Sequence, residues 1–432
     1  MAVTRPAFVG RLAARAAVPV YPVIGTGMAT EVQRLGLDGR VVLAGSPRHA
    51  TVLLVAGDIG DHLVAALAQV HDAVPRPRAT VWWAPPADGV PAAFEATTVV
   101  AADDDIVTAL RSAHRGLMLG TRAGEPPILA DEDPVPWRGE GPYGHGGSGM
   151  TGGTPYGRPI AGRDDDHRDG LTLDVVPITI GPFVPFLPPG LELRIVLSGD
   201  LVHAVEVVGP PDRDGGAVPE APDPGEPPLV ADVERARARH HLRWTAWALK
   251  VHGLDRLGQW ALSLAESEVI GPSDIARLER RLRRSGLFTW HTQGLGRLPP
   301  DTVAGAGLGP VARAAGVDED TRSDDPSYQE LGFVPVTHDT GDTRARWLQR
   351  LAEARQALEL AGQAGDRRAR GAFESPHPTP TGQRLLLTRI PELITDLEWG
   401  DAVAVIASLD LDPEAATGPR LPQAGGPGLV VQ

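Results

Sequence analysis

The feature that most restricts the fold is a strand–helix–strand pattern near the N-terminus. Residues 40–43, 52–57 and 80–84 are apolar runs of the length expected for buried strands of a parallel sheet. Between the second and third runs lies a segment, 61–74, whose apolar residues recur at helical spacing: Leu63, Ala66, Leu67 and Val70. Strand, crossover helix and strand in this order predict an N-terminal doubly wound α/β unit with a parallel sheet over residues 1–130.

A second, smaller β unit is expected downstream. Residues 191–197 and 201–208 are β-type runs joined through Ser198-Gly199-Asp200, as in a hairpin turn. We therefore predict a small antiparallel sheet over residues 171–208. The complete chain is then an α/β unit followed by an α+β unit.

Helical patterns dominate the remainder, and residues 231–413 are predicted to form a helical domain. Two amphipathic helices are expected, because apolar residues recur every three or four positions. The second helix is predicted to begin at Asp342 or Thr343 as N-cap and to end near Gly362 or Gly365. The repeating residues are Trp247, Val251, Leu254, Leu257, Ala261 and Leu264 in the first helix, and Trp347, Leu351, Ala354, Leu358 and Ala361 in the second.

Two segments rich in glycine and proline separate these units. Residues 131–170 are predicted to be an inter-domain loop, since nine of the nineteen residues in 139–157 are glycine. Residues 209–230 are predicted to be a linker, because 209–228 contains seven prolines and four glycines. Residues 414–432 are expected to be a flexible tail.

The chain contains no cysteine. Thiolates hold iron–sulfur clusters and nickel–iron centres and most structural zinc sites. We therefore expect no such cofactor in this chain, unless a partner supplies every thiolate, and no metal site. A net charge of -14 disfavours binding to nucleic acid. No apolar run approaches the roughly 20 residues that span a bilayer, and no signal peptide is recognised, so a cytoplasmic location is expected.

The N-terminal unit resembles the B subunit of NADH-quinone oxidoreductase, the small subunit that carries the last cluster before quinone. Ser46-Pro47-Arg48 and the run 52–57 resemble that family's "SPRQADVLIVAG", and 74–77 fits its "MPEPK" turn. Residues 23–27 (VIGTG) and 83–86 (WAPP) occupy two of the regions where the family has cluster-ligating cysteines, and the final cysteine-containing turn has no counterpart. The resemblance implies an electron carrier that has lost its cluster.

The segment from about residue 181 to 413 resembles the D subunit of the same enzyme, which is related to the large subunit of nickel–iron hydrogenases. Gly181, Pro182 and Arg194 match the hydrogenase-type "GP-x-H … PG-x-x-R" hairpin, with Val184 in place of the histidine. In relatives this histidine lies at the quinone or catalytic cleft. The resemblance implies that these four positions line a degenerate cleft, with no catalytic and no cofactor-binding residue retained.

Three further stretches carry the same resemblance. Residues 294–317 resemble "G-x-G … GLTGPVLRASGV", followed by Asp320, Arg322 and Asp325 where the family reads "D-x-R". Residues 374–376 (ESP) and 401–410 (DAVAVIASLD) resemble "ESPRG" and "DVVAIIASID". The region with the family's tyrosine would fall where 209–228 lies, so the central chemical machinery is expected to be deleted.

Other motifs have simpler explanations than a ligand site. The sequence 144–149 fits G-x-G-x-x-G, but no strand precedes it and no helix follows, so a loop is favoured over nucleotide binding. The run 164–167 (DDDH) is interpreted as a solvated turn rather than a cation site. His240 and His241 are adjacent on one helix and cannot chelate one ion from a single face, so they are predicted to be surface polar residues.

The remaining notable side chains are explained in the same way. The basic run Arg277, Arg280, Arg281, Arg283 and Arg284 is interpreted as a solvated helix face, with an acidic partner surface as the alternative. Trp82 and Trp83 are expected to be core or interface aromatics.

Three functions are compatible with the sequence. The first is a redox-inactive scaffold or coupling element, peripheral on the cytoplasmic side of the membrane, in a complex with membrane-embedded antiporter-like subunits. The second is an oxidoreductase subunit that contributes to quinone binding and uses a partner's cofactors. The third is a soluble protein that binds an unidentified small molecule on the retained scaffold. Whether the chain takes part in catalysis is left open.

Overall fold

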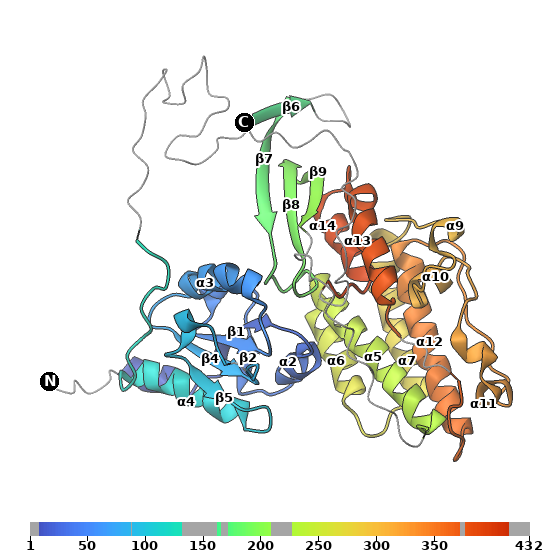
Figure 1. Ribbon diagram of the computed structural model, residues 1–432, viewed down its shortest axis with the longest axis horizontal. Helices are drawn as coiled ribbons and strands as arrows, with labels where there is room; N and C mark the ends of the chain where they lie inside the picture. Colours follow the sequence, from blue (N-terminus) through green and yellow to red (C-terminus); the bar gives the residue numbers. More distant parts are fainter. Residues whose placement is uncertain are drawn as a thin grey trace.

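The computed structural model describes residues 8–87, 89–131, 162–165, 172–208, 227–371 and 376–413. Figure 1 shows three parts: a parallel sheet with its helices at the lower left, an antiparallel sheet at the top centre, and a helical region on the right. Among the described residues, no helix has the length and apolarity needed to cross a membrane.

The N-terminal part is built on a five-stranded, all-parallel sheet in the order β2-β1-β3-β4-β5. The predicted parallel sheet is therefore confirmed. β1 was not among the predicted strands. It contains Pro19 and Pro22, which are unusual in a central strand, yet β1 pairs on both sides. The strands are β1 (Val18–Ile24), β2 (Val41–Leu43), β3 (Val52–Ala56), β4 (Ala79–Trp83) and β5 (Thr98–Val100).

Helices cover both faces of this sheet, because successive residues of a strand point to opposite sides. In β3, Leu54 and Ala56 pack in one core with α2 (Ala29–Leu35) and α4 (Ile106–Leu119). Leu53 and Val55 pack in a second core with α3 (Val64–Ala73). The short helix α1 (Phe8–Ala13) precedes the sheet. Trp82 and Trp83 are buried, as expected for core aromatics.

The second part is a four-stranded antiparallel sheet in the order β6-β7-β8-β9. The predicted hairpin is confirmed, with Gly199 at φ +64° in its turn. Within the segment expected to be a loop, residues 162–165 instead form an edge strand that pairs with β7. The strands are β6 (Gly162–Asp165), β7 (Thr172–Ile180), β8 (Glu192–Ser198) and β9 (Leu201–Val208).

The third part consists of helices packed around two large cores and one smaller core. One large core lies between α13, α14 and the strands β8 and β9, and the other lies among α5, α6, α7 and α12. The smaller core joins one end of α5 and one end of α12 to Tyr328 and Phe333. The long helices are α5 (Val230–Val251), α6 (Asp255–Ala265), α7 (Pro272–Arg284), α12 (Thr343–Gln363), α13 (Pro380–Ile394) and α14 (Trp399–Ser408). Single-turn helices lie between them: α8 (Leu287–Trp290), α9 (Pro300–Val303), α10 (Pro310–Arg313) and α11 (Pro326–Gln329).

The helix predicted over residues 247–264 is in fact two helices. α5 ends at Val251 and α6 begins at Asp255, because Gly253 adopts φ +69° and ends the first helix. The second prediction is confirmed: Asp342 caps α12 by accepting a hydrogen bond from the Ala345 amide at 2.8 Å. The five arginines of α7 are exposed, whereas Ile275, Leu278 and Leu282 are buried, so the solvated-face interpretation fits.

Candidate functional site

The loop between β7 and β8 joins the N-terminal part to the rest of the molecule. Phe183 is buried in the core that contains α3, and the Tyr21 hydroxyl on β1 donates a hydrogen bond to the Phe183 carbonyl. On the other side, the Trp247 indole N–H on α5 donates to the Pro185 carbonyl at 3.0 Å. The loop is therefore fixed between the parallel sheet and the helical region.

Three of the four predicted cleft positions lie in this loop. Gly181 has φ +106°, and a Cβ on it would lie 2.0 Å from the Leu191 carbonyl oxygen, so the close approach of β8 requires glycine. Pro182 follows it, and Val184 packs against the core formed with α13 and α14. Arg194 lies apart on β8, where its side chain is 57% exposed and reaches Glu206 at 3.4 Å.

The interior of the helical region contains a network of ionised side chains. Arg313 binds Glu353 of α12 through two hydrogen bonds, from Nε at 2.7 Å and from Nη2 at 3.1 Å. The same guanidinium lies 3.1 Å from Asp320, and His241 of α5 lies 3.3 Å from Glu353. Burial alone would raise the pKa of Glu353, but the neighbouring Arg313 and His241 hold it well below its usual range.

The network continues along α5. Arg322 donates to Asp320 at 2.6 Å and to Glu234 at 3.1 Å, and the Tyr328 hydroxyl donates to Glu234 at 2.7 Å. Arg237 lies 3.5 Å from Glu234. Three guanidiniums thus face three carboxylates. The network therefore has no net charge if the His241 ring is uncharged. Burial lowers the pKa of His241 to about 4, despite the opposing effect of Glu353, so its ring is neutral at pH 7.

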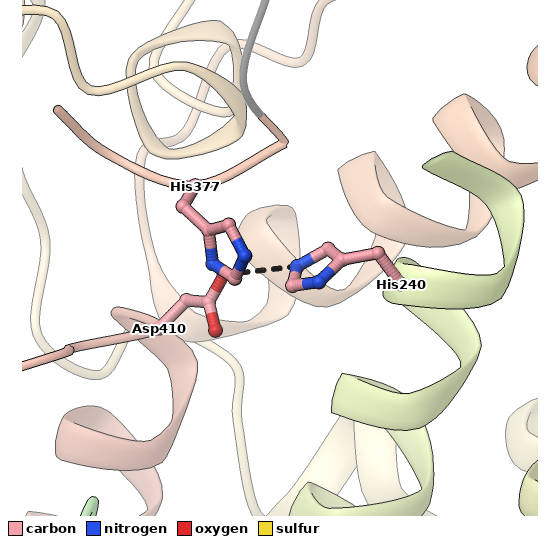
Figure 2. Close-up of side chains that lie close together, drawn as sticks. All are labelled: His240, His377 and Asp410. Carbon is pink, nitrogen blue, oxygen red and sulfur yellow. Dashed lines mark hydrogen bonds and ion pairs between the residues drawn. The ribbon is translucent and has the colours of Figure 1, made fainter. Parts of the chain in front are cut away.

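A second cluster lies close by and combines metal-ligating side chains from three segments. Figure 2 shows His240 of α5, His377 before α13 and Asp410 after α14 pointing toward one another. The Oδ2 atom of Asp410 lies 3.4 Å from His240 Nε2 and 3.3 Å from His377 Nδ1. The two imidazole centroids are 3.9 Å apart. Among the described residues, these three form a group whose ligand atoms all lie within 4.8 Å of one another.

Arg350 of α12 places a positive charge beside this cluster and keeps Asp410 ionised. Its Nη2 atom lies 3.1 Å from Asp410 Oδ2, and its guanidinium lies 4.6 Å from the centroid of the Trp244 ring. Burial alone would raise the pKa of Asp410, but Arg350 and His377 hold it well below its usual range. Burial, and then the neighbouring His377, lower the pKa of His240 to about 3. At neutral pH the cluster therefore consists of a carboxylate and a neutral His240.

The prediction that His240 and His241 are surface residues was wrong. The side chain of His241 is fully buried and that of His240 is 19% exposed. α12 packs directly on this stretch of α5, and the ion pairs compensate the burial of polar groups there. The two rings do diverge, as expected for adjacent helical positions, and they contact different carboxylates.

No local pattern connects His240 with His377 or Asp410, because they are separated by 137 and 170 positions in the chain. The sequence nevertheless contained an indication of two of these residues. The matched stretch 374–376 ends immediately before His377, and the stretch 401–410 ends at Asp410. The structure places Asp410 at φ +56°, a conformation that non-glycine residues rarely adopt.

Several sequence candidates fall outside the described residues. These are the glycine-rich motif 144–149, the pair Asp166-His167, Glu374-Ser375 and most of the predicted linker 209–230. Asp164 and Asp165 belong to the edge strand β6 instead of the predicted solvated turn.

Comparison with known proteins gives the family context of the helical region. The family described as the respiratory-chain NADH dehydrogenase 49 Kd subunit matches residues 259–398. This segment runs from within α6 to the residue before α14 and contains Arg313, Asp320, Arg322, Glu353 and His377. His240 and Asp410 lie on either side of it.

Individual proteins similar to this chain include D subunits of NADH-quinone oxidoreductase. The NADH-quinone oxidoreductase D 2 subunit of Sinorhizobium medicae is 37% identical over 113 residues, which are 26% of this chain and 28% of the relative. The corresponding D 1 subunit of Streptomyces coelicolor is 42% identical over 104 residues, 23% of this chain and 26% of the relative. The chain thus spans less than a third of the length of these curated relatives.

Among solved structures, a chain of the membrane-bound sulfane sulfur reductase, an archaeal respiratory membrane complex, superposes with a TM-score of 0.42 at 16% identity. The superposition covers 56% of this chain and 98% of that chain.

Proposed function

We propose that this chain is a peripheral subunit of a membrane-bound complex related to NADH-quinone oxidoreductase and energy-converting hydrogenases. In this role it acts as a redox-inactive scaffold or coupling element for antiporter-like membrane subunits, on the cytoplasmic side. The observation that carries the proposal is the match of residues 259–398 to the 49 Kd subunit family in a chain without a single cysteine. A chain without thiolates has no ligands for an iron–sulfur cluster.

The domain organisation belongs to the same proposal. Residues 1–130 would derive from a B-type subunit and the segment from about residue 181 to 413 from a D-type subunit, fused so that their shared interface is retained. The contacts made by the β7–β8 loop support this idea, since Phe183 and Val184 of one short segment pack in the two different halves. The four cleft positions Gly181, Pro182, Val184 and Arg194 would then be remnants of a cofactor cleft.

Co-purification tests the proposal. The tagged chain is isolated from its own organism's membranes in mild detergent, and stoichiometric partners are identified by mass spectrometry, with untagged cells as control. Antiporter-like membrane subunits at a fixed ratio to the chain are the expected result. Recovery of the chain alone, or iron or nickel bound in stoichiometric amount to the isolated chain, would refute the scaffold role.

A quinone-binding role with a partner's cofactors is a second candidate. It is favoured by the position of the β7–β8 loop between the two halves, and it is disfavoured by Val184 at the family's histidine position. Quinone-dependent turnover by the purified complex decides between the two. Turnover that is lost when the chain is cleaved between its two halves would support the second role, and no turnover by an intact complex would leave the scaffold role.

A further inference from the structure

We propose that His240, His377 and Asp410 form a binding site for a divalent transition-metal ion of the zinc class. The site is independent of the proposed membrane complex, and its test requires no partner. It also differs from a thiolate-held cluster, since its ligands are two imidazole nitrogens and one carboxylate oxygen.

The separations between Asp410 and the two imidazoles match those of ligands that share one zinc ion. Two ligands bound tetrahedrally at about 2.0–2.2 Å from zinc are separated by about 3.3–3.6 Å. Asp410 Oδ2 lies 3.4 Å from His240 Nε2 and 3.3 Å from His377 Nδ1. Good hydrogen bonds between nitrogen and oxygen measure about 2.7–3.2 Å. Both contacts therefore match the edge of a coordination tetrahedron.

The ligand types select the class of ion. Magnesium and calcium prefer sets made entirely of oxygen, whereas two imidazoles and one carboxylate suit zinc, copper, nickel and iron(II).

The surrounding structure holds two of the ligands in place and leaves the third exposed to solvent. His240 is fixed on the long helix α5, and Asp410 follows α14 directly, so two of the ligands are carried by packed elements. Arg350 lies 3.1 Å from the same Oδ2 atom of Asp410 and approaches it from inside the protein. Its positive charge lowers the affinity relative to a free carboxylate. The side chain of His377 is 46% exposed, which gives an ion access and leaves a coordination position for water.

Zinc titration of the untagged full-length chain is the direct test. Protein freed of metal with chelator is titrated with Zn²⁺ by calorimetry, and the number of tight sites is counted. We expect one tight equivalent in the natural chain. His377→Ala should weaken it by more than about 100-fold, because loss of a ligand costs more than the 10- to 100-fold typical of an outer-shell partner. His377 is half-exposed, so this variant is expected to fold.

A matched control separates this site from adventitious binding to surface histidines. His49 is exposed on the N-terminal part, far from the cluster in sequence, and His49→Ala should leave the tight equivalent unchanged. The proposal is overturned if the natural chain shows no tight equivalent, or if His377→Ala binds zinc as well as the natural chain does.

Cobalt provides a second measurement, which reports the coordination of the bound ion. Co²⁺ placed between two imidazoles and a carboxylate gives visible absorption bands of a four- or five-coordinate ion, whereas solvated Co²⁺ gives only weak ones. These bands should appear in the natural chain and in His49→Ala and should be absent from His377→Ala. A spectrum of hexa-aqua type in all three proteins would contradict the proposed site.

Discussion

The parallel-sheet region and the helical region fill their interiors with different chemistry. Apolar side chains form most of the two cores on either face of the parallel sheet. Two buried polar side chains there, His71 and Arg78, pair with carboxylates nearer the rim, since Asp72 and Glu125 keep 17% and 13% of their side chains exposed. In the helical region Glu353 and Glu234 are 1% and 0% exposed and lie between packed helices.

The difference indicates which region meets a requirement other than stability. Burial of apolar surface stabilises a fold without needing a particular partner. Buried ion pairs are a poor source of stability, because the cost of desolvating two charges offsets most of their attraction. The helical region therefore keeps charged groups that an apolar core would replace at little cost, and it is also the region that matches the 49 Kd subunit family.

The largest expected effect comes from Glu353→Gln in α12. The substitution leaves Arg313 and His241 facing a neutral group at a fully buried position. Breaking a buried ion pair by removing one partner costs about 3–5 kcal/mol of unfolding free energy. Urea denaturation followed by circular dichroism measures the loss. Glu359→Gln is the matched control, since Glu359 is exposed on the same helix and should shift stability by less than about 0.5 kcal/mol.

A similar loss is expected from an apolar truncation in the other region. Leu110 of α4 is fully buried against the parallel sheet, so Leu110→Ala should cost about 3 kcal/mol through lost burial and the cavity that remains. Leu129→Ala, at a 44% exposed leucine, is the control.

Hydrogen exchange shows whether the two regions respond separately to Leu110→Ala. Faster amide exchange in β3 and β4 with unchanged exchange in α12 would mean that the regions open independently. Amide exchange that speeds up equally in α12 would contradict independent opening. The apolar core of the sheet region would then also determine the stability of the helical region.

A smaller effect is expected from acid. Burial, with a contribution from His291, lowers the pKa of His252 to about 4, whereas an unfolded histidine titrates near 6.5. Between these values the unfolded chain binds the extra proton, so stability falls as pH drops from about 6.5 to 4. His252→Gln should remove about 1–2 kcal/mol of the stability difference between pH 7.5 and pH 5. Urea midpoints at the two pH values measure it.

His49→Gln, at an exposed site in the sheet region, serves as the reference for this pH experiment. If His252→Gln and His49→Gln change the pH dependence by the same amount, burial of His252 does not contribute to it.

The smallest effect concerns the junction between the regions. The Tyr21 hydroxyl, whose pKa burial raises to about 12, donates to the Phe183 carbonyl at neutral pH. Tyr21→Phe should cost about 1 kcal/mol, because the carbonyl loses its partner while the ring stays packed. Amide exchange in the β7–β8 loop should increase with it. An unchanged midpoint would mean that the aromatic packing alone holds the junction.

Local patterns were enough to predict much of the fold. The apolar runs at β3 and β4 predicted a parallel sheet, Gly199 marked the hairpin, and Asp342 was correctly expected to cap α12. Each of these features depends on residues within a few positions of one another. The break at Gly253 was missed because the apolar spacing continues across it from α5 into α6.

The charged interior and the metal cluster depend on contacts between distant positions. Arg322 and Glu234 are 88 positions apart, and His240 and Asp410 are 170 apart, so no local pattern pairs them. One feature of the sequence did indicate the charged interior. Glu234, Arg237 and His241 recur at helical spacing in α5, as do Arg346, Arg350 and Glu353 in α12. A polar stripe on each of two helices that also carry apolar stripes indicates that these helices face one another.

The interior network also constrains how this sequence can diverge. Leu110 can change to another apolar residue of similar size without any change elsewhere, because packing tolerates such exchanges. Arg313, Asp320 and Glu353 cannot change one at a time, since each single change leaves an uncompensated charge inside the protein. Related sequences should therefore inherit or replace these positions together, so that Arg313 and Glu353 co-vary across lineages while the residues of the sheet core drift independently.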